Sequence, residues 1–191
     1  MNGRTLVAGI GNVFLGDDGF GVETLRALSA HPLPPGVEAV DFGVRGVHLA
    51  YQVLEGYDTL VLVDATARGG APGTLYLIEV GEDTAAPPDG AAPSDGAAPP
   101  TGAALDGHDM SPSTVLALLD TLCAGTGAEA PRRVLVLGCE PACVEEGIGL
   151  SGPVADAVPR AVRALLELLA QEEPYASGTD DPNRRELRST P

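Results

Sequence analysis

The residues best suited to chemistry stand where apolar runs of the sequence end. Asp18 lies in the glycine-rich loop GIGNVFLGDDGFGVE (residues 9–23), which follows the first run, and Asp41 and Asp64 lie at the ends of the second and third. Ligands of an open α/β sheet collect beyond the carboxyl ends of its strands, so we expect Asp18, Asp64 and His108 to converge on one crevice. His108 comes three residues before a predicted helix.

Three of these residues make a chemically sensible set. Asp18, Asp64 and His108 offer two carboxylates and one imidazole. Such a mixed oxygen and nitrogen donor set suits a borderline divalent metal ion that keeps exchangeable positions. Taken singly, each residue also has a structural explanation, because acids cap helices and a loop histidine is often only a surface residue. The set, rather than any one member, predicts a metal site.

The glycine-rich loop is a poor phosphate site. A dinucleotide-binding fingerprint needs a third glycine where this chain has Phe14. Asp17 and Asp18 would also place negative charge near the helix N-terminus that normally attracts phosphate. We therefore expect the loop to offer Asp18 to a cation, with Asp17 either supporting its neighbour or capping the helix.

Other catalytic and metal-binding patterns are weak. The sequence has no G-x-S-x-G nucleophile elbow and no H-E-x-x-H zinc helix. Cys139 and Cys143 are four residues apart but lack nearby partner ligands, which disfavours a thiolate metal site. Cys123 is expected in the core and His31 on the surface. His48 opens a predicted helix, where a structural role is favoured.

The element pattern predicts an α/β fold, in which a three-layer single domain has helices on both faces of a mostly parallel, about five-stranded twisted sheet. The fourth strand alternates in polarity, which indicates an edge strand that could be antiparallel. The predicted strands span 5–10, 37–42, 59–65, 74–80 and 133–139, and the predicted helices 21–30, 46–56, 111–125 and 153–171. Pro159 allows either a kink in the last helix or a later start.

Two segments have compositions that cannot build a core. Residues 81–107 contain a repeat of DGAAP, and residues 173–191 are similarly polar and rich in turn formers. We therefore predict one domain over residues 1–172, interrupted by a low-complexity, mobile insert at 81–107 and followed by a disordered tail at 173–191.

Charge and composition exclude several classes of partner. The formal net charge of −16 argues against nucleic acid and anionic membranes, because both require clustered Lys and Arg. No apolar run approaches the ~20 residues of a membrane span, and the N-terminus does not resemble a signal peptide. Three cysteines make no disulfide framework. We expect a cytoplasmic protein.

With these motifs in order, the sequence resembles the nickel–iron hydrogenase maturation endopeptidases. The resemblance covers about residues 5–170 and rests on GIGNVFLGDDGFGVE, DFGVRGVHL, LVLVDA, HDMSP and GIGLS. It departs from the family in its longer segment before His108 and in having Asp at position 18, where some members have Glu. Gly43 and Gly46 resemble the family segment beside the scissile region.

The resemblance implies an endopeptidase that removes the C-terminal extension of a hydrogenase large-subunit precursor after nickel insertion. It implies that Asp18, Asp64 and His108 contact nickel that the substrate supplies, and that they form the catalytic site of an aspartic-type peptidase without an organic cofactor. The expected partner is the large-subunit precursor, and the protein is expected to be a monomer. The alternative is a nickel-binding escort without catalysis, which would need the same ligands.

Overall fold

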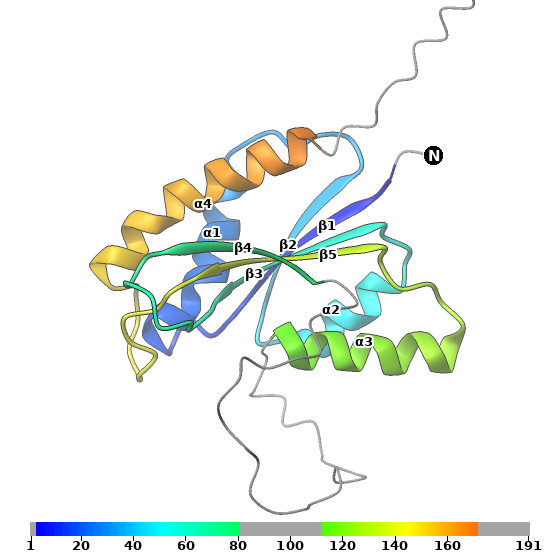
Figure 1. Ribbon diagram of the computed structural model, residues 1–191, viewed down its shortest axis with the longest axis horizontal. Coiled ribbons are helices and arrows are strands. Elements are labelled where there is room, and N and C mark those ends of the chain that lie inside the picture. The colour runs from blue at the N-terminus through cyan, green and yellow to red at the C-terminus, as the bar shows by residue number, and fades with distance from the viewer. Residues whose placement is uncertain (1–2, 81–111, 172–191) are drawn as a thin grey trace, which may run out of the picture.

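The computed structural model describes residues 3–80 and 112–171, which form one five-stranded sheet between two layers of helices (Figure 1). The strand order is β2-β1-β3-β5-β4. The strands β1, β2, β3 and β5 are parallel, and β4 runs antiparallel along β5 at the edge, which confirms the predicted fold. The strands span Thr5–Ile10 (β1), Val37–Gly43 (β2), Thr59–Ala65 (β3), Leu75–Val80 (β4) and Arg133–Cys139 (β5).

Helices cover both faces of the sheet. Helices α1 and α4 pack together on one face, and α2 and α3 pack together on the other (Figure 1). A short 3-10 helix, η1, leads directly into α1. These elements span Gly16–Gly19 (η1), Phe20–Leu28 (α1), Gly46–Val53 (α2), Pro112–Thr126 (α3) and Gly152–Gln171 (α4).

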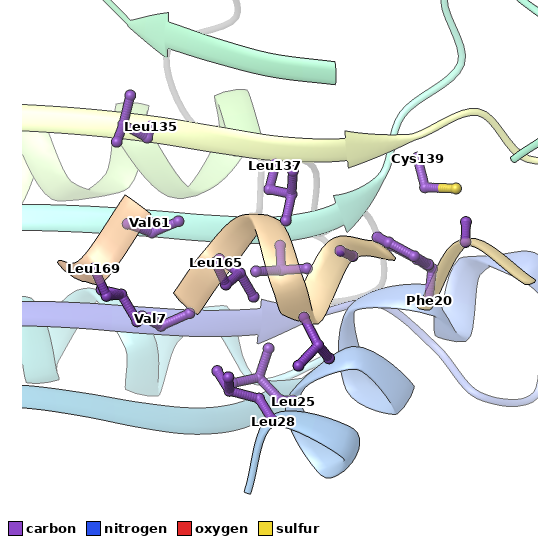
Figure 2. Close-up of a cluster of buried hydrophobic side chains, with 14 of the residues drawn as sticks. Val7, Phe20, Leu25, Leu28, Val61, Leu135, Leu137, Cys139, Leu165 and Leu169 are labelled. Carbon is purple, nitrogen blue, oxygen red and sulfur yellow. The ribbon is translucent and has the colours of Figure 1, made fainter. Parts of the chain in front are cut away.

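Strand β3 is buried on both faces, which explains why its sequence is almost continuously apolar. Val61 and Val63 face the cluster beneath α1 and α4, which Figure 2 draws with Leu165. Leu60 and Leu62 face the second cluster, beneath α2 and α3. Because successive side chains of a strand point to opposite faces, a strand buried on both sides must be apolar at every position.

The helix ends differ from the predictions by a few residues. Helix α2 ends at Val53 rather than at residue 56, because the next three amides bond three residues back instead of four. The chain then turns at Gly56, whose φ of 90° favours glycine. Helix α4 begins at Gly152 and continues through Pro159, so the later start allowed by that proline is wrong.

Several predictions concern residues outside the described part of the chain. The predicted insert at 81–107, the predicted tail at 173–191 and the candidate ligand His108 all fall there. Within residues 3–80 and 112–171, no helix combines the length and apolar character needed to span a membrane.

Candidate functional site

Asp64 lies at the carboxyl end of the central strand β3 and is almost completely buried, with 5% of its surface exposed. Burial and, to a smaller extent, the negative charge of Asp18 together raise the pKa of its carboxyl group to about 8, although a hydrogen bond from the Ala65 backbone acts to lower it. An isolated protein at neutral pH therefore holds a proton on Asp64. A buried acid facing a second carboxylate is a combination found at functional sites.

Asp18 reaches this position from the loop between β1 and α1. It lies in η1 and is half-buried, and its Oδ2 accepts a hydrogen bond of 2.6 Å from the amide of Asn12. Gly11 has a φ of 125°, and any side chain there would collide with the main-chain oxygen of Asp18. The loop glycines thus permit a backbone path that brings Asp18 near enough for its charge to act on Asp64.

Gly21 seats the following helix against the sheet. A side chain at this position would overlap the main-chain oxygens of Ile10 and Val63, at the ends of β1 and β3. The absence of a side chain lets α1 begin directly beside those two strand ends. The same close approach carries η1, and with it Asp18, to the end of β3.

Asp17 has a different role from its neighbour. It is buried, and its carboxylate accepts hydrogen bonds from the amides of Ala142 (2.7 Å), Cys143 (3.0 Å) and Ser151 (2.6 Å) and from the Ser151 hydroxyl (2.9 Å). Burial alone would raise its pKa, but these bonds outweigh burial and lower it. Asp17 is thus an ionised clamp on the loop between β5 and α4, and it caps neither η1 nor α1.

Main-chain hydrogen bonds complete this clamp. The amide of Gly16 donates to Gly147 O at 3.0 Å, and the amide of Gly147 donates to Phe14 O at 2.9 Å. The segment 140–151, which contains the GIGLS motif, is therefore held against the loop that carries Asp18. Two regions more than a hundred residues apart in sequence are thereby joined next to Asp18.

Glu140 is a buried carboxylate that the sequence analysis did not select. It accepts hydrogen bonds from the amides of Arg68 (2.8 Å) and Gly69 (3.0 Å) and from the Tyr76 hydroxyl (2.9 Å). Burial acts to raise its pKa, but these partners lower it. The residue directly follows β5, so its place at a strand end was the signal that could have identified it. Its bonds assign it to holding the β3–β4 loop.

A cleft of about 410 Å³ opens next to Asp18. Its walls are the start of the β1–η1 loop, from Gly11 to Phe14, and the end of β2 with the turn that follows, from Asp41 to Arg45. Val22 of α1 contributes to the lining. The cleft was not predicted, although Gly43, which the family resemblance placed beside the scissile region, lies in it.

The remaining candidates separate into surface and core. Asp41 lies within β2 and is exposed at the cleft, and His31 and His48 are also exposed. Cys139 is fully buried, and burial raises the pKa of its thiol to about 11, whereas Cys143 is exposed. One of these two cysteines is thus in the core and the other is on the surface.

The described residues supply two members of the predicted metal set. The charge of Asp18 acts on Asp64, whereas His108 lies outside the described part of the chain. Over residues 3–80 and 112–171, no group of three or more His, Cys, Asp or Glu residues is arranged to hold a metal ion. The pair of carboxylates alone leaves most positions of a bound cation open for ligands from elsewhere.

Comparisons with known proteins agree with this architecture. Residues 22–86 match the family model described as hydrogenase maturation protease. The hydrogenase expression/formation protein HoxM of Azotobacter vinelandii is 32% identical over 92% of this chain and 76% of its own length. A putative hydrogenase maturation protease of Methanocaldococcus jannaschii is 40% identical over 84% of this chain and 93% of its own.

A solved structure shows the same relationship. The hydrogenase maturating endopeptidase HybD from E. coli superposes with a TM-score of 0.64 and 28% identity, covering 88% of this chain and 93% of the other. Sequence similarity over nearly the whole domain and the shared fold thus lead to one assignment. The chain belongs to the hydrogenase maturation protease family.

Proposed function

We propose that this protein is an endopeptidase that removes the C-terminal extension of a nickel–iron hydrogenase large-subunit precursor and recognises the nickel already bound in that substrate. The observation that carries the proposal is the buried carboxyl group of Asp64 at the end of β3, on which the charge of Asp18 in η1 acts. The membership of the chain in the hydrogenase maturation protease family supports the reaction class.

The electrostatics of the pair favour a cation that arrives with the substrate. A divalent ion between the two carboxylates would compensate both causes of the raised pKa of Asp64, its burial and its neighbour's charge. Asp64 would then release its proton when the loaded substrate docks. A precursor without nickel would meet a protonated, weakly binding Asp64, and this difference gives a physical basis for discrimination.

The proposed chemistry assigns roles to three residues. Asp18, Asp64 and His108 would contact the nickel ion, which would polarise the scissile carbonyl or a water molecule as a Lewis acid. Either carboxylate, once ionised, could take the proton of the attacking water if it lies within hydrogen-bond reach. We also propose a cytoplasmic location, because all three cysteines are unpaired, as suits a reducing compartment.

The test adds the purified protein to nickel-loaded and nickel-free precursor and follows the mass of the precursor. We expect loss of a C-terminal peptide from the loaded form alone. Unchanged mass of both forms, with nickel still bound, would instead indicate an escort without catalysis. Asp64→Ala and His108→Ala should abolish cleavage, whereas Asp156→Ala and His31→Ala, at exposed positions, serve as matched controls. Normal cleavage by Asp64→Ala would refute the site assignment.

A further inference from the structure

The cleft beside Asp18 is apolar in a strongly acidic protein. Val22 and Phe42 are buried in its lining, and Phe14 and Val44 stand at its mouth. Phe14 is 64% exposed and Val44 is 41% exposed, although the chain carries a net charge of −16. Large apolar side chains left open to water around a concave site are typical of a surface that binds an apolar group.

The cleft shares its wall with the proposed reaction site. Asn12 lines the cleft and donates its amide to Asp18 Oδ2 at 2.6 Å. Gly11 also lines it, and a Cβ there would lie 3.7 Å from the same carboxylate oxygen. The backbone of Gly11 and Asn12 is therefore all that separates a group bound in the cleft from the Asp18 carboxylate.

The two loops that form the cleft are also joined to each other. The amide of Gly11 donates to Gly43 O at 3.1 Å, where β1 and β2 end with a shift in register. Both glycines have positive φ, 125° and 53°. These backbone conformations exclude most side chains from the junction and keep the space between the loops open.

We propose that this cleft binds an apolar side chain of the polypeptide substrate immediately next to the scissile bond. The inference rests on the proposed endopeptidase function, which requires that bond to lie at Asp18 and Asp64. The occupant belongs to the substrate, because the cleft and the Asp18 carboxylate share the Asn12 backbone as a wall. A volume of about 410 Å³ suits one or two side chains rather than a folded domain.

The lining also predicts which side chains are rejected. An acidic side chain would be placed close to Asp18 and Asp41, and the Arg45 guanidinium in the lining already donates to the main-chain oxygens of Phe42 and Asp41. A lysine would lose its hydration against Val22 and Phe42. Removing well-matched apolar contacts in such a pocket costs roughly 10–200-fold in kcat/KM. We therefore expect replacement of the apolar flanking residue by Asp to reduce kcat/KM by at least about tenfold.

The test uses nickel-loaded precursors in which each residue flanking the scissile bond is changed separately to Val, Asp or Lys. The native protein should prefer Val on one flank. Val44→Lys should weaken cleavage of the Val substrate and improve that of the Asp substrate, because it adds a cation at the mouth of the cleft. Leu77→Lys is the control, since Leu77 is 58% exposed on the edge strand β4, at the opposite side of the sheet from β2.

Two results would overturn the inference while leaving the endopeptidase function intact. One is equal cleavage of the Val, Asp and Lys substrates on both flanks. The other is a preference that Val44→Lys leaves unchanged or that Leu77→Lys alters equally.

A binding measurement separates the inference from the function it rests on. The flanking residue is replaced by a photoreactive benzoylphenylalanine, and the site of crosslinking is read by mass spectrometry. Adducts at Phe14 or Val44 support the cleft even if no precursor is cleaved, an outcome that would refute the endopeptidase function alone. Adducts confined to other surfaces refute the cleft.

Discussion

Replacing Asp64 by Asn should make the isolated protein more stable, and increasingly so as the pH rises. The native state holds Asp64 protonated up to a pKa of about 8, because of burial and the charge of Asp18. In the unfolded chain the same group ionises near its ordinary value of about 3.9. At a pH between these two pKa values, folding of the wild type requires Asp64 to take up a proton. Asn has no ionisable group, so the variant folds without that proton uptake.

The sign and size follow from proton linkage. Below about pH 4 both states of the wild type hold the proton, so the substitution has no linked effect there. Between about pH 4 and pH 8 the folded state binds one more proton than the unfolded state, so wild-type stability falls by up to roughly 1.4 kcal/mol per pH unit. From about pH 5 to pH 7.5 the advantage of the variant should grow by about 1–3 kcal/mol, allowing for relaxation around the buried charge.

The assay is urea unfolding of wild type and Asp64→Asn across this pH range, with a chelator present to remove divalent ions. Asp156→Asn, at an exposed position on α4, should show no such trend. A constant difference at all pH values would attribute the effect to packing instead of ionisation. A variant that becomes less stable than wild type as the pH rises would show that the fold stabilises the ionised form, which would refute the electrostatic account of the site.

Three further substitutions test the frame around the site. Asp17→Asn should lower the free energy of unfolding by about 2–4 kcal/mol near neutral pH, because hydrogen bonds to a carboxylate are lost. This difference should shrink as acid protonates Asp17 in the wild type. Urea unfolding at several pH values measures it. Gly21→Ala should lower the free energy of unfolding by about 1–3 kcal/mol or more, because its methyl group clashes with main-chain oxygens of β1 and β3. Thermal unfolding measures this loss. Gly152→Ala is the control and should be tolerated, because a methyl group there meets no atom. Leu165→Ala should cost about 2–5 kcal/mol in urea unfolding by opening a cavity under α4, and Leu77→Ala at the exposed edge should cost little.

The sheet and the carboxylate pair were accessible from sequence because both follow local rules. The run around Val61 is apolar at every position, as a strand covered on both faces requires, and strands 5–10, 59–65 and 133–139 were predicted with their observed bounds. Asp18 and Asp64 were paired because both follow parallel strands, whose carboxyl ends share one edge of the sheet.

What the sequence could not supply depends on loops that meet in space. Asp17 and Asp18 are adjacent and chemically identical, and only the packing of residues 140–151 makes one a structural clamp and leaves the other at the site. Glu140 could have been selected from its strand-end position, but its hydrogen bonds to the β3–β4 loop decide its role. The cleft likewise exists because the loop at Phe14 and the turn at Val44 lie side by side.

The clamp at Asp17 also constrains the order in which the surroundings of Asp18 can form. Its hydrogen-bond partners, Ala142, Cys143 and Ser151, are made at the ribosome long after the loop that they hold. Contacts between such distant segments form late, because closing a long stretch of chain carries an entropic cost. A nascent chain that has emerged only through β3 therefore carries both Asp18 and Asp64 but lacks the support that orders their loop. The surroundings of Asp18 and Asp64 are thus completed only after β5 and the turn into α4 have been synthesised, when the domain is nearly whole.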